Sequence, residues 1–393
     1  MFVIPRRICF VTTLPVTLTT FVRPQADYLV ARGWDVSCAC ASQDGLEEIL
    51  PPGVRYHPMP FRRGMDLLGV ARAVLCLYRL FRMEEYDLVQ YSTPNAAFYA
   101  STAAWLARVP VRLYAQWGIR YVGFEGFRRW IFKRVEVWTC GRSTIIEPDS
   151  LGNIEFSVAE GLYPRSKARV IWNGSACGVD LARFSISRKS EWRREWREQL
   201  CLKPESVVVG FVGSIRRDKG CNELLAAFRS VSLEFPGARL LLVGDEEFSS
   251  TLEPGLRSWM TQSDRVLCVG LTTRIPEHMA CMDMLVLPSY REGFGMVVIE
   301  AEAMGVPVIV SDVPGPTDAM LPGHTGLVVP ARDVEALAEA LHTMLADASM
   351  RERMGVEAVR FARSGFEQAE FLRRAERDKR DIIRPIYERE SAR

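Results

Sequence analysis

The sequence contains few of the groups that bind metals or form disulfides in a recognisable pattern. Its four histidines are scattered, and its ten cysteines include no C-x-x-C pair. Most of the cysteines fall in or beside apolar stretches, which favours buried thiols in a reducing compartment over a disulfide framework. A zinc site is therefore not expected, and neither is any other metal or cofactor.

The sequence also lacks the features of an exported or membrane-spanning protein. It opens with MFVIPRRICFVTT, which leads directly into a strand pattern instead of the layout of a signal peptide. No run approaches the 18 uncharged apolar residues that a membrane-spanning helix requires. We therefore expect a cytoplasmic protein.

Neither sign of charge is in large excess over the whole chain, but charge is unevenly placed. The net charge is +2, to which residues 1–175 contribute +6 and the remainder −4. The basic first half is consistent with binding to an anionic surface or substrate. The alternative is that surface charge varies along the chain without a functional reason. No nucleic-acid partner is expected.

Short apolar runs alternate with longer helical patterns along the whole chain. In the first half, the expected strands are residues 8–13, 35–41, 54–59, 86–92, 111–115, 144–148 and 168–171. After Gly178 the pattern restarts, with expected strands at residues 207–214, 239–244, 266–269, 284–288 and 306–311. Alternation of strand and helix indicates βαβ units and parallel sheets. Two such series predict an α/β protein with two doubly wound, Rossmann-like domains, residues 1–175 and 176–365.

Ligands of open α/β sheets bind beyond the carboxyl ends of the strands, so the loops that follow strands are the candidate sites. The first such loop reads GSIRRDKG and covers residues 213–220. It brings Arg216, Arg217 and Lys219 to the start of a helix, and a helix N-terminus and cations together suit a diphosphate. The loop is not a Walker A motif. A solvated charged turn is the alternative if this loop is taken alone.

The second loop, residues 288–300, reads PSYREGFGMVVIE. Gly293 and Gly295 allow the backbone to approach a ligand closely, and Glu292 and Glu300 flank this turn. One carboxylate can accept hydrogen bonds from two neighbouring hydroxyls of a ribose or hexose. The third loop, residues 311–317, contains glycine and prolines and is expected to form part of the pocket wall.

These motifs resemble family four of the retaining glycosyltransferases, which have the GT-B fold of two Rossmann-like domains facing across a cleft. REGFGMVVIEAEAMG is similar to the family's E-x7-E signature, VGSIRRDKG to its phosphate loop, and GVPVIVSD to the strand that follows. The opening ICFVTTLP and the later FVRPQADYLVARGWDV resemble members that build bacterial surface polysaccharides on lipid carriers.

The resemblance implies that the second domain binds a nucleotide sugar and the first domain an acceptor. Lys219 would hold the diphosphate, Glu300 the ribose and Glu292 the transferred sugar, and Arg217 joins Lys219 and Glu292 as a catalytic candidate. The other implied donor-binding residues are Gly213, Ser214, Arg216, Gly293, Phe294, Gly295 and Met296. The terminal helix, from Phe366 onward, would cross back to the first domain.

Two positions depart from the family's pattern. Ser214 stands where the family usually has arginine, and Arg216 or Arg217 is the candidate substitute. Trp117, in the sequence YAQWG, stands where many members have a histidine before a glycine. The candidate acceptor-side residues are Leu14, Pro15, Trp117 and Gly118.

The expected reaction is transfer of a hexose with retention at the anomeric carbon. The donor is expected to be a UDP-sugar, with GDP open, and the acceptor a glycan or polyprenyl-diphosphate-linked glycan in polysaccharide biosynthesis. Cations and helix-end donors would stabilise the leaving diphosphate, which needs no metal. The alternatives are a non-hydrolysing nucleotide-sugar epimerase and a non-catalytic sugar-binding protein. Glu292, Glu300 and Lys219 together disfavour both alternatives.

Two helical stretches of the first half combine apolar and basic side chains. In residues 124–138, Phe127, Trp130, Ile131 and Arg134 fall near one face, and residues 66–83 carry arginines after Arg62 and Arg63. Aromatic residues beside arginines suit the headgroup layer of a bilayer, which favours peripheral association with an anionic membrane. Ordinary packing inside the first domain is the alternative.

Overall fold

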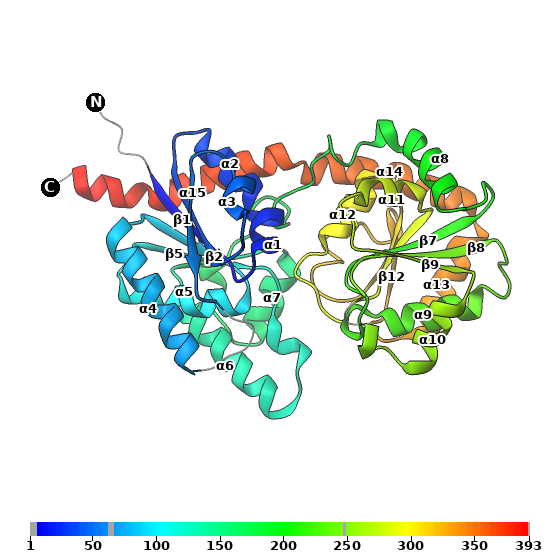
Figure 1. Cartoon of the computed structure of the whole chain (residues 1–393), viewed down its shortest axis with the longest axis horizontal. Helices are drawn as coiled ribbons and strands as arrows, with labels where there is room; N and C mark the ends of the chain where they lie inside the picture. Colours follow the sequence, from blue (N-terminus) through cyan, green and yellow to red (C-terminus); the bar gives the residue numbers. More distant parts are fainter. Residues whose placement is uncertain (1–5, 62–66, 247–248, 392–393) are drawn as a thin grey trace. The chain divides into compact units, whose positions relative to one another are not determined.

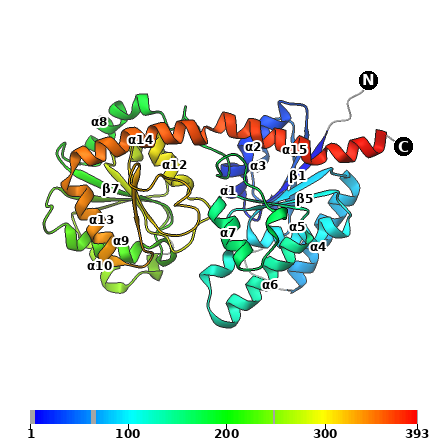
Figure 2. The same cartoon turned by 180° about the vertical axis from the view of Figure 1, so that it is seen from behind.

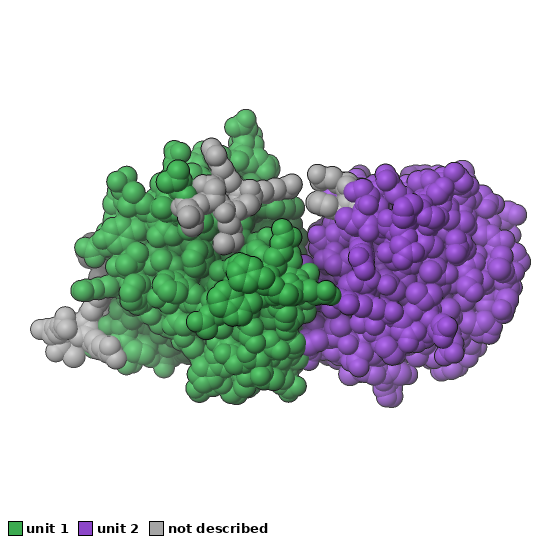
Figure 3. Space-filling view, turned by 90° about the horizontal axis from the view of Figure 1, so that it is seen from below, with its two compact units in different colours: residues 1–177, 369–393 green, residues 178–368 purple. Residues whose placement is uncertain are grey.

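The computed structural model describes residues 6–61, 67–246 and 249–391. The chain forms two compact units, the first comprising residues 1–177 and 369–393 and the second residues 178–368 (Figure 3). The sequence-based domain limits were 175 and 365. Because each unit has its own sheet and its own hydrophobic cores, the two are described separately.

The sheet of the first unit is parallel throughout, with the strand order β3-β2-β1-β4-β5-β6 (Figure 1). In the central strand, Ile8 is in register with Val36 on one side and with Leu88 on the other. The order reverses between β1 and β4, which is the switch point where doubly wound sheets bind ligands. The strands are β1 (Arg7–Val11), β2 (Asp35–Ala41), β3 (Val54–Met59), β4 (Leu88–Tyr91), β5 (Val111–Gln116) and β6 (Ile145–Pro148).

Helices cover both faces of this sheet (Figures 1 and 2). One core is built with α4 (Leu67–Glu84), α5 (Pro94–Leu106) and α6 (Gly126–Arg142), and α5 contacts both of the others. The opposite core is built with α2 (Arg23–Val30) and α15 (Gln368–Ser391), which contributes Ile383. The remaining α-helices of this unit are α1 (Pro15–Thr17), α3 (Leu46–Ile49) and α7 (Leu151–Ala159).

The second unit has a parallel sheet with the order β12-β11-β10-β7-β8-β9. Its central strands are almost continuously apolar, as strands buried on both faces are. The order reverses between β7 and β10. The strands are β7 (Val207–Val212), β8 (Ala238–Val243), β9 (Val266–Gly270), β10 (Met284–Leu287), β11 (Val308–Ser311) and β12 (Gly326–Val329).

Two hydrophobic cores hold the helices of the second unit against its sheet. One core includes side chains of α9 (Cys221–Val231), α10 (Pro254–Gln262) and α13 (Val334–Ala346). The other includes side chains of α8 (Lys189–Gln199), α11 (Ile275–Cys281), α12 (Met296–Ala303) and the end of α14 (Ala348–Phe366).

The expected fold class is confirmed, because both units are doubly wound parallel sheets. The strand expected at residues 168–171 is wrong. Ala168 makes only an isolated bridge to Ile146, and the chain leaves the sheet edge in a turn closed by the Gly174 N–H on the Ile171 carbonyl. In the part of the chain that the structure describes, no helix is both long and apolar enough to cross a membrane.

Candidate active site

The sheet order of the second unit brings three of its loops together. Residues 213–220 follow β7, residues 288–295 follow β10, and residues 311–317 begin at the last residue of β11. These three strands are neighbours in the sheet. Because all strands are parallel, their carboxyl ends meet at one edge. The three loops that the sequence singled out therefore lie side by side.

Glycines allow these loops to touch. Gly220 has a φ of +73°, and a Cβ added to it would lie 2.0 Å from the carbonyl oxygen of Pro288. Gly315 has a φ of +103°, and its added Cβ would lie 2.4 Å from the carbonyl oxygen of Gly293. Both positions combine a left-handed backbone with a contact that no side chain allows, so the packed loops depend on glycine.

Lys219 and Glu292 meet where the first two loops touch. The Lys219 ammonium lies 2.5 Å from Oε1 of Glu292, and the Ser289 hydroxyl donates to the same oxygen at 2.8 Å. Lys219 ends a short 3-10 turn before α9, and Glu292 precedes the glycines before α12. A cation and a carboxylate that the sequence placed 73 residues apart are thus in direct contact.

Glu300 lies in the second turn of α12 and is enclosed by protein, although part of its surface remains accessible. Burial raises the pKa of this carboxyl to about 7, and the positive charge of Arg183 opposes the rise. A carboxylate that is partly accessible, and whose negative charge is little compensated by groups of the protein, is suited to accept hydrogen bonds from a ligand.

Between the two glutamates, the chain presents backbone groups to the candidate site more than side chains. The Phe294 ring is buried and packs on Phe366, with the ring centroids 5.4 Å apart. Gly295 has a φ of +87° and precedes α12, whose first residue, Met296, packs against the neighbouring core. The first backbone N–H groups of a helix have no partner within the helix, so they are available to an anion.

The loop after β7 begins at Gly213 and Ser214. Its two arginines, Arg216 and Arg217, have different environments. Arg216 and Arg291 both contact the Asp218 carboxylate, at 2.7 Å and 3.2 Å. Arg217 is exposed and its guanidinium lies within hydrogen-bonding reach of the Tyr290 hydroxyl. Ser214 is partly buried and brings no charge. Sequence reasoning missed Asp218 and Arg291, whose only signal was their place beside Lys219 and Glu292.

The acceptor-side candidates lie at the carboxyl edge of the first unit's sheet. Leu14 and Pro15 form the start of α1 after β1, and Trp117 and Gly118 follow β5. The sheet order places β4 between these two loops. Trp117 packs on Phe21 with ring centroids 5.7 Å apart, so its indole is held by the protein instead of standing free in solvent.

Two threonines that the sequence analysis missed join the ends of β1 and β4. The hydroxyls of Thr13 and Thr93 lie 2.7 Å apart, and the Thr13 N–H donates to the Thr93 hydroxyl at 3.0 Å. Thr93 has a φ of +65°, which is rare for a β-branched residue. Such strain is commonly found at functional sites, but an isolated threonine has no sequence signal that would reveal it.

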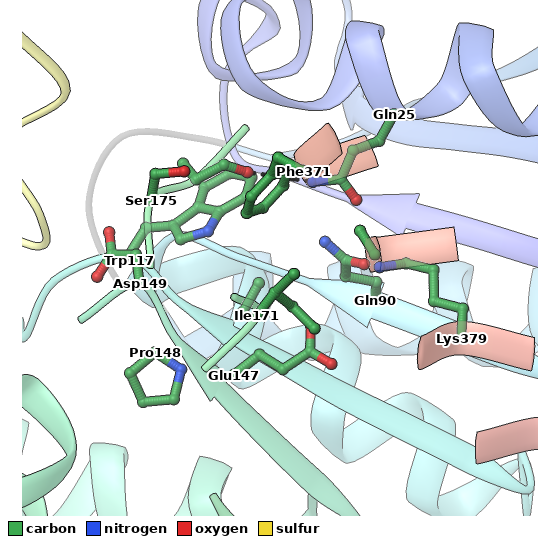
Figure 4. Close-up of a pocket in the computed structure, with 13 residues that line it drawn as sticks. Gln25, Gln90, Trp117, Glu147, Pro148, Asp149, Ile171, Ser175, Phe371 and Lys379 are labelled. Atoms are coloured by element: carbon green, nitrogen blue, oxygen red, sulfur yellow. Dashed lines mark hydrogen bonds between the residues drawn. The ribbon is translucent and has the colours of Figure 1, made fainter. Parts of the chain in front are cut away.

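A small polar cavity lies beneath Trp117, between the sheet and α15 (Figure 4). Gln25, Gln90, Glu147 and Lys379 line it, and all four are buried. Its volume is about 20 Å³, which is room for about one water molecule. The cavity is too small for a sugar, so it does not compete with the loop edges as the candidate site. Over residues 6–61, 67–246 and 249–391, no three histidine, cysteine or acidic side chains are grouped as metal ligands.

Comparison with known proteins identifies both halves of the chain. Residues 17–174 match the family model described as "Glycosyl transferase 4-like domain", and residues 193–360 match the model described as "Glycosyl transferases group 1". The chain is a glycosyltransferase with two Rossmann-like domains. It belongs to the glycosyltransferase group that these two models describe, which confirms the resemblance to family four.

Full-length relatives and solved structures agree with this assignment. The chain is 28% identical to the capsular polysaccharide biosynthesis glycosyltransferase CapM of Staphylococcus aureus, over 85% of this chain and 86% of CapM. It is 26% identical to a UDP-Gal:alpha-D-GlcNAc-diphosphoundecaprenol alpha-1,3-galactosyltransferase of Escherichia coli, over 78% of this chain and 79% of that enzyme.

Among solved structures, the fold is similar to that of a sucrose-phosphate synthase from Thermosynechococcus elongatus. The TM-score is 0.79 at 21% identity, covering 97% of this chain and 100% of the synthase. Anabaena HepE in complex with UDP and glucose gives a TM-score of 0.79 at 20% identity, covering 96% and 100%. These likenesses establish the GT-B fold.

Proposed function

We propose that the protein transfers a hexose from a UDP-sugar to a glycan or lipid-linked acceptor in polysaccharide biosynthesis, with retention at the anomeric carbon. The contact between Lys219 and Glu292 at the edge of the second unit's sheet carries this proposal. The CapM relative is named for capsular polysaccharide biosynthesis, the Escherichia coli relative for a UDP-sugar and a diphosphoundecaprenol acceptor. The likeness to a structure that contains UDP supports the choice of nucleotide.

The proposed roles follow from the charges of the site. Cleavage of the sugar–phosphate bond leaves negative charge on the diphosphate, which Lys219 and the N-terminus of α12 would stabilise. Lys219 and Glu292 neutralise each other in the structure. A bound diphosphate would attract Lys219, and the Glu292 carboxylate would then accept hydrogen bonds from the sugar. Glu300 would accept from the two ribose hydroxyls.

The proton of the acceptor hydroxyl has a destination in the substrate itself. In a retaining transfer of this kind, the hydroxyl approaches from the side on which the leaving phosphate departs. The departing phosphate oxygen then takes the proton as the new glycosidic bond forms. The site residues bind, orient and stabilise charge, and none of them is required to act as a general base.

Incubation of the protein with single UDP-sugars, with and without a polyprenyl-diphosphate-linked glycan, tests the reaction. We expect a glycosylated lipid and an equal amount of UDP only when the acceptor is present, with an α-linkage formed from an α-linked donor. An inverted linkage would refute retention. Epimerised donor in the absence of acceptor would indicate the epimerase, and binding without turnover for every donor would indicate a sugar-binding protein.

Peripheral membrane association is part of the proposal, and α4 and α6 supply its surface. On α6, Phe127 is 73% exposed and Trp130 is 59% exposed, and their rings stack 5.8 Å apart. Arg128 and Arg134 are exposed on the same helix. Ile131 does not belong to this exposed face, because it is partly buried against the protein.

The exposed side of α4 repeats the combination. Leu68 is 85% exposed and Met83 is 79% exposed, and the exposed arginines between them are Arg72, Arg79 and Arg82. Arg62, Arg63 and Asp66 lie outside the described residues. Each basic residue near an anionic bilayer contributes about 1 kcal/mol, and large apolar side chains add burial in the headgroup layer.

Co-sedimentation with vesicles of anionic or neutral lipid, at low and high salt, tests the membrane surface. We expect binding to anionic vesicles at low salt, and its loss in the Phe127→Ser/Trp130→Ser variant. Leu233→Ser is the matched control, since Leu233 is as exposed but lies in the second unit. Wild-type protein that stays in the supernatant with anionic vesicles at low salt would refute membrane association and leave the glycosyltransferase assignment unaffected.

A further inference from the structure

One lysine stands in the buried face of α15. Residues at intervals of four along this face are all buried, namely Phe371, Ala375, Lys379 and Ile383. Three of them are apolar, as the packed side of a helix requires, and the fourth is a lysine that is only 1% exposed. A lysine is almost never buried to this extent unless its ammonium has a polar partner. A partner for Lys379 is therefore expected inside the first unit.

The protein itself does not supply that partner. In the ranges that the structure describes, the Lys379 ammonium makes no hydrogen bond and no ion pair. The neighbouring carboxylate of Asp378 is paired with Arg169, whose Nη2 lies 2.9 Å away. Figure 4 shows that the Lys379 side chain extends from α15 toward Gln90, across the small cavity that both side chains line. The ammonium therefore needs a partner within this cavity.

Three oxygen atoms around the same cavity also lack partners. They are the Oε1 atoms of Gln25 in α2, Gln90 in β4 and Glu147 in β6. Each is shielded from bulk solvent and accepts no hydrogen bond from a described residue. Nε of Arg169 lies 3.5 Å from Oε1 of Glu147, which is close enough for charge attraction but not for a good hydrogen bond. Buried polar atoms of native proteins are nearly always hydrogen-bonded, either to protein or to ordered water.

We propose that the cavity binds one water molecule, through which Lys379 of α15 is joined to Gln90 and Glu147 of the sheet. The volume of about 20 Å³ exceeds the roughly 10–15 Å³ that one buried water needs. The ammonium donates to the water oxygen, and the water donates to the amide and carboxylate oxygens, so one molecule gives each of the three groups a partner. The water anchors α15 to β4 and β6, since a bridging hydrogen bond is almost as favourable as a direct one.

The charges around the cavity select water over an ion. A metal cation would lie beside the Lys379 ammonium, and a halide ion beside the Glu147 carboxylate. Repulsion between like charges is strong where the protein excludes solvent. A water molecule accepts from the ammonium and donates to the carboxylate at the same time, and a sugar does not fit a cavity of this size. The water site is therefore independent of which sugar or acceptor the protein uses.

A crystal structure of the full chain, at a resolution that shows ordered water, tests the site directly. We expect one water within hydrogen-bonding distance of Nζ of Lys379 and of at least one of the Gln90 and Glu147 side chains. A cavity without density for water would overturn the proposal, and so would a direct contact of Lys379 with Gln90 or Glu147 that closes the cavity. Neither result bears on sugar transfer, so failure of the water site is distinguishable from failure of the proposed function.

The melting temperature of the Gln90→Met variant tests the site in solution. Methionine is similar in shape to glutamine and lacks the amide. If water is bound, the variant loses a hydrogen bond, and the melting temperature should fall by about 2–4 °C. In a dry cavity the Gln90 amide would be buried without a partner. An unchanged or raised melting temperature would therefore overturn the proposal. Gln43→Met, at an exposed glutamine of the same unit, is the matched control.

Hydrogen–deuterium exchange along α15 tests the anchoring role. Lys379→Met removes the donor to the water and keeps a long side chain, so we expect residues 371–383 to exchange about fivefold faster than in the wild type, the effect of losing one hydrogen bond. Arg377→Met, at an exposed position of the same helix, should exchange at the wild-type rate. Exchange of α15 at the wild-type rate in Lys379→Met would overturn the proposal, because the helix would then be held without the water.

Discussion

The two units have the same sheet and different chemistry at its edge. In each unit, the first and fourth strands of the series are neighbours at the centre of the sheet. The second and third strands extend the sheet on the side of the first, and the fifth and sixth extend it on the side of the fourth. In the second unit, the loops at the carboxyl edge carry the Lys219–Glu292 pair and the Asp218 carboxylate with the two arginines that contact it. In the first unit, the corresponding edge carries the neutral Thr13–Thr93 pair and the Trp117 indole. The strand order fixes where a ligand binds, and the loop residues decide which ligand binds there.

The largest effect is expected for Lys219, because it is the cation in contact with the acidic residue of the site. Lys219→Ala should lower kcat by on the order of 10²–10³, the usual result of removing one preorganised charge that stabilises a leaving group. Lys203→Ala is the control, since Lys203 is exposed in the same unit. Steady-state kinetics on both variants measure the difference. If the kinetics of Lys219→Ala were close to those of the control, the carboxyl edge of the second unit's sheet would not take part in the reaction.

The two glutamates should separate nucleotide binding from sugar transfer. Glu300→Gln should weaken UDP about 10-fold, because the ribose loses a charged acceptor. Glu292→Gln should leave UDP affinity nearly unchanged and lower the rate of sugar transfer. Calorimetry with UDP and turnover with the UDP-sugar give the two values for each variant. Equal losses of UDP affinity in both variants would show that the roles are not separate.

The pKa of Glu300 makes the donor site sensitive to pH. Burial raises this pKa to about 7 in the free protein, and ribose hydroxyls would donate to the ionised form. Affinity for UDP should therefore be complete above pH 7 and fall as the pH drops below 7 and Glu300 takes up a proton. The Glu300→Gln protein cannot show this change, so subtracting its pH profile removes the titration of UDP itself. Identical profiles of the two proteins between pH 6 and pH 8 would contradict the assignment.

The smallest effect is expected at the edge of the first unit. Trp117→Ala should raise the KM for the acceptor by about fivefold, the scale of losing a large aromatic contact. The affinity for UDP should not change, because the nucleotide is assigned to the second unit. The melting temperature is measured in parallel, since Trp117 also packs on Phe21. A loss of UDP affinity without a loss of stability would contradict the assignment of the acceptor to the first unit and the nucleotide to the second.

Much of the second unit's site could be predicted from the sequence, because its determinants are local. Apolar runs locate the strands, the loops after them carry the charged residues, and the parallel order brings those loops to one edge. Lys219 and Glu292 could be named in this way, and the structure brings them together. The family models then confirm the class of enzyme.

Contacts between side chains of different loops could not be predicted. The convergence of Arg216 and Arg291 on Asp218 depends on how closely residues 213–220 pack on residues 288–295, which no periodicity encodes. The Thr13–Thr93 contact likewise joins two ordinary threonines across neighbouring strands. The strand expected at residues 168–171 does not form, for a related reason. This segment lies at the edge of the sheet and has few pairing partners, so the turn that follows it determines its conformation.

Hydrogen–deuterium exchange of the whole chain, with and without saturating UDP, tests the division between the two edges most directly. We expect UDP to slow exchange in residues 213–220 and 288–300, where the loops and the start of α12 would bind the nucleotide. Residues 12–18 and 116–119 should exchange at the same rate in both samples, because UDP alone offers nothing to the acceptor side. Protection confined to residues 12–18 and 116–119, with none at residues 213–220 and 288–300, would contradict the account.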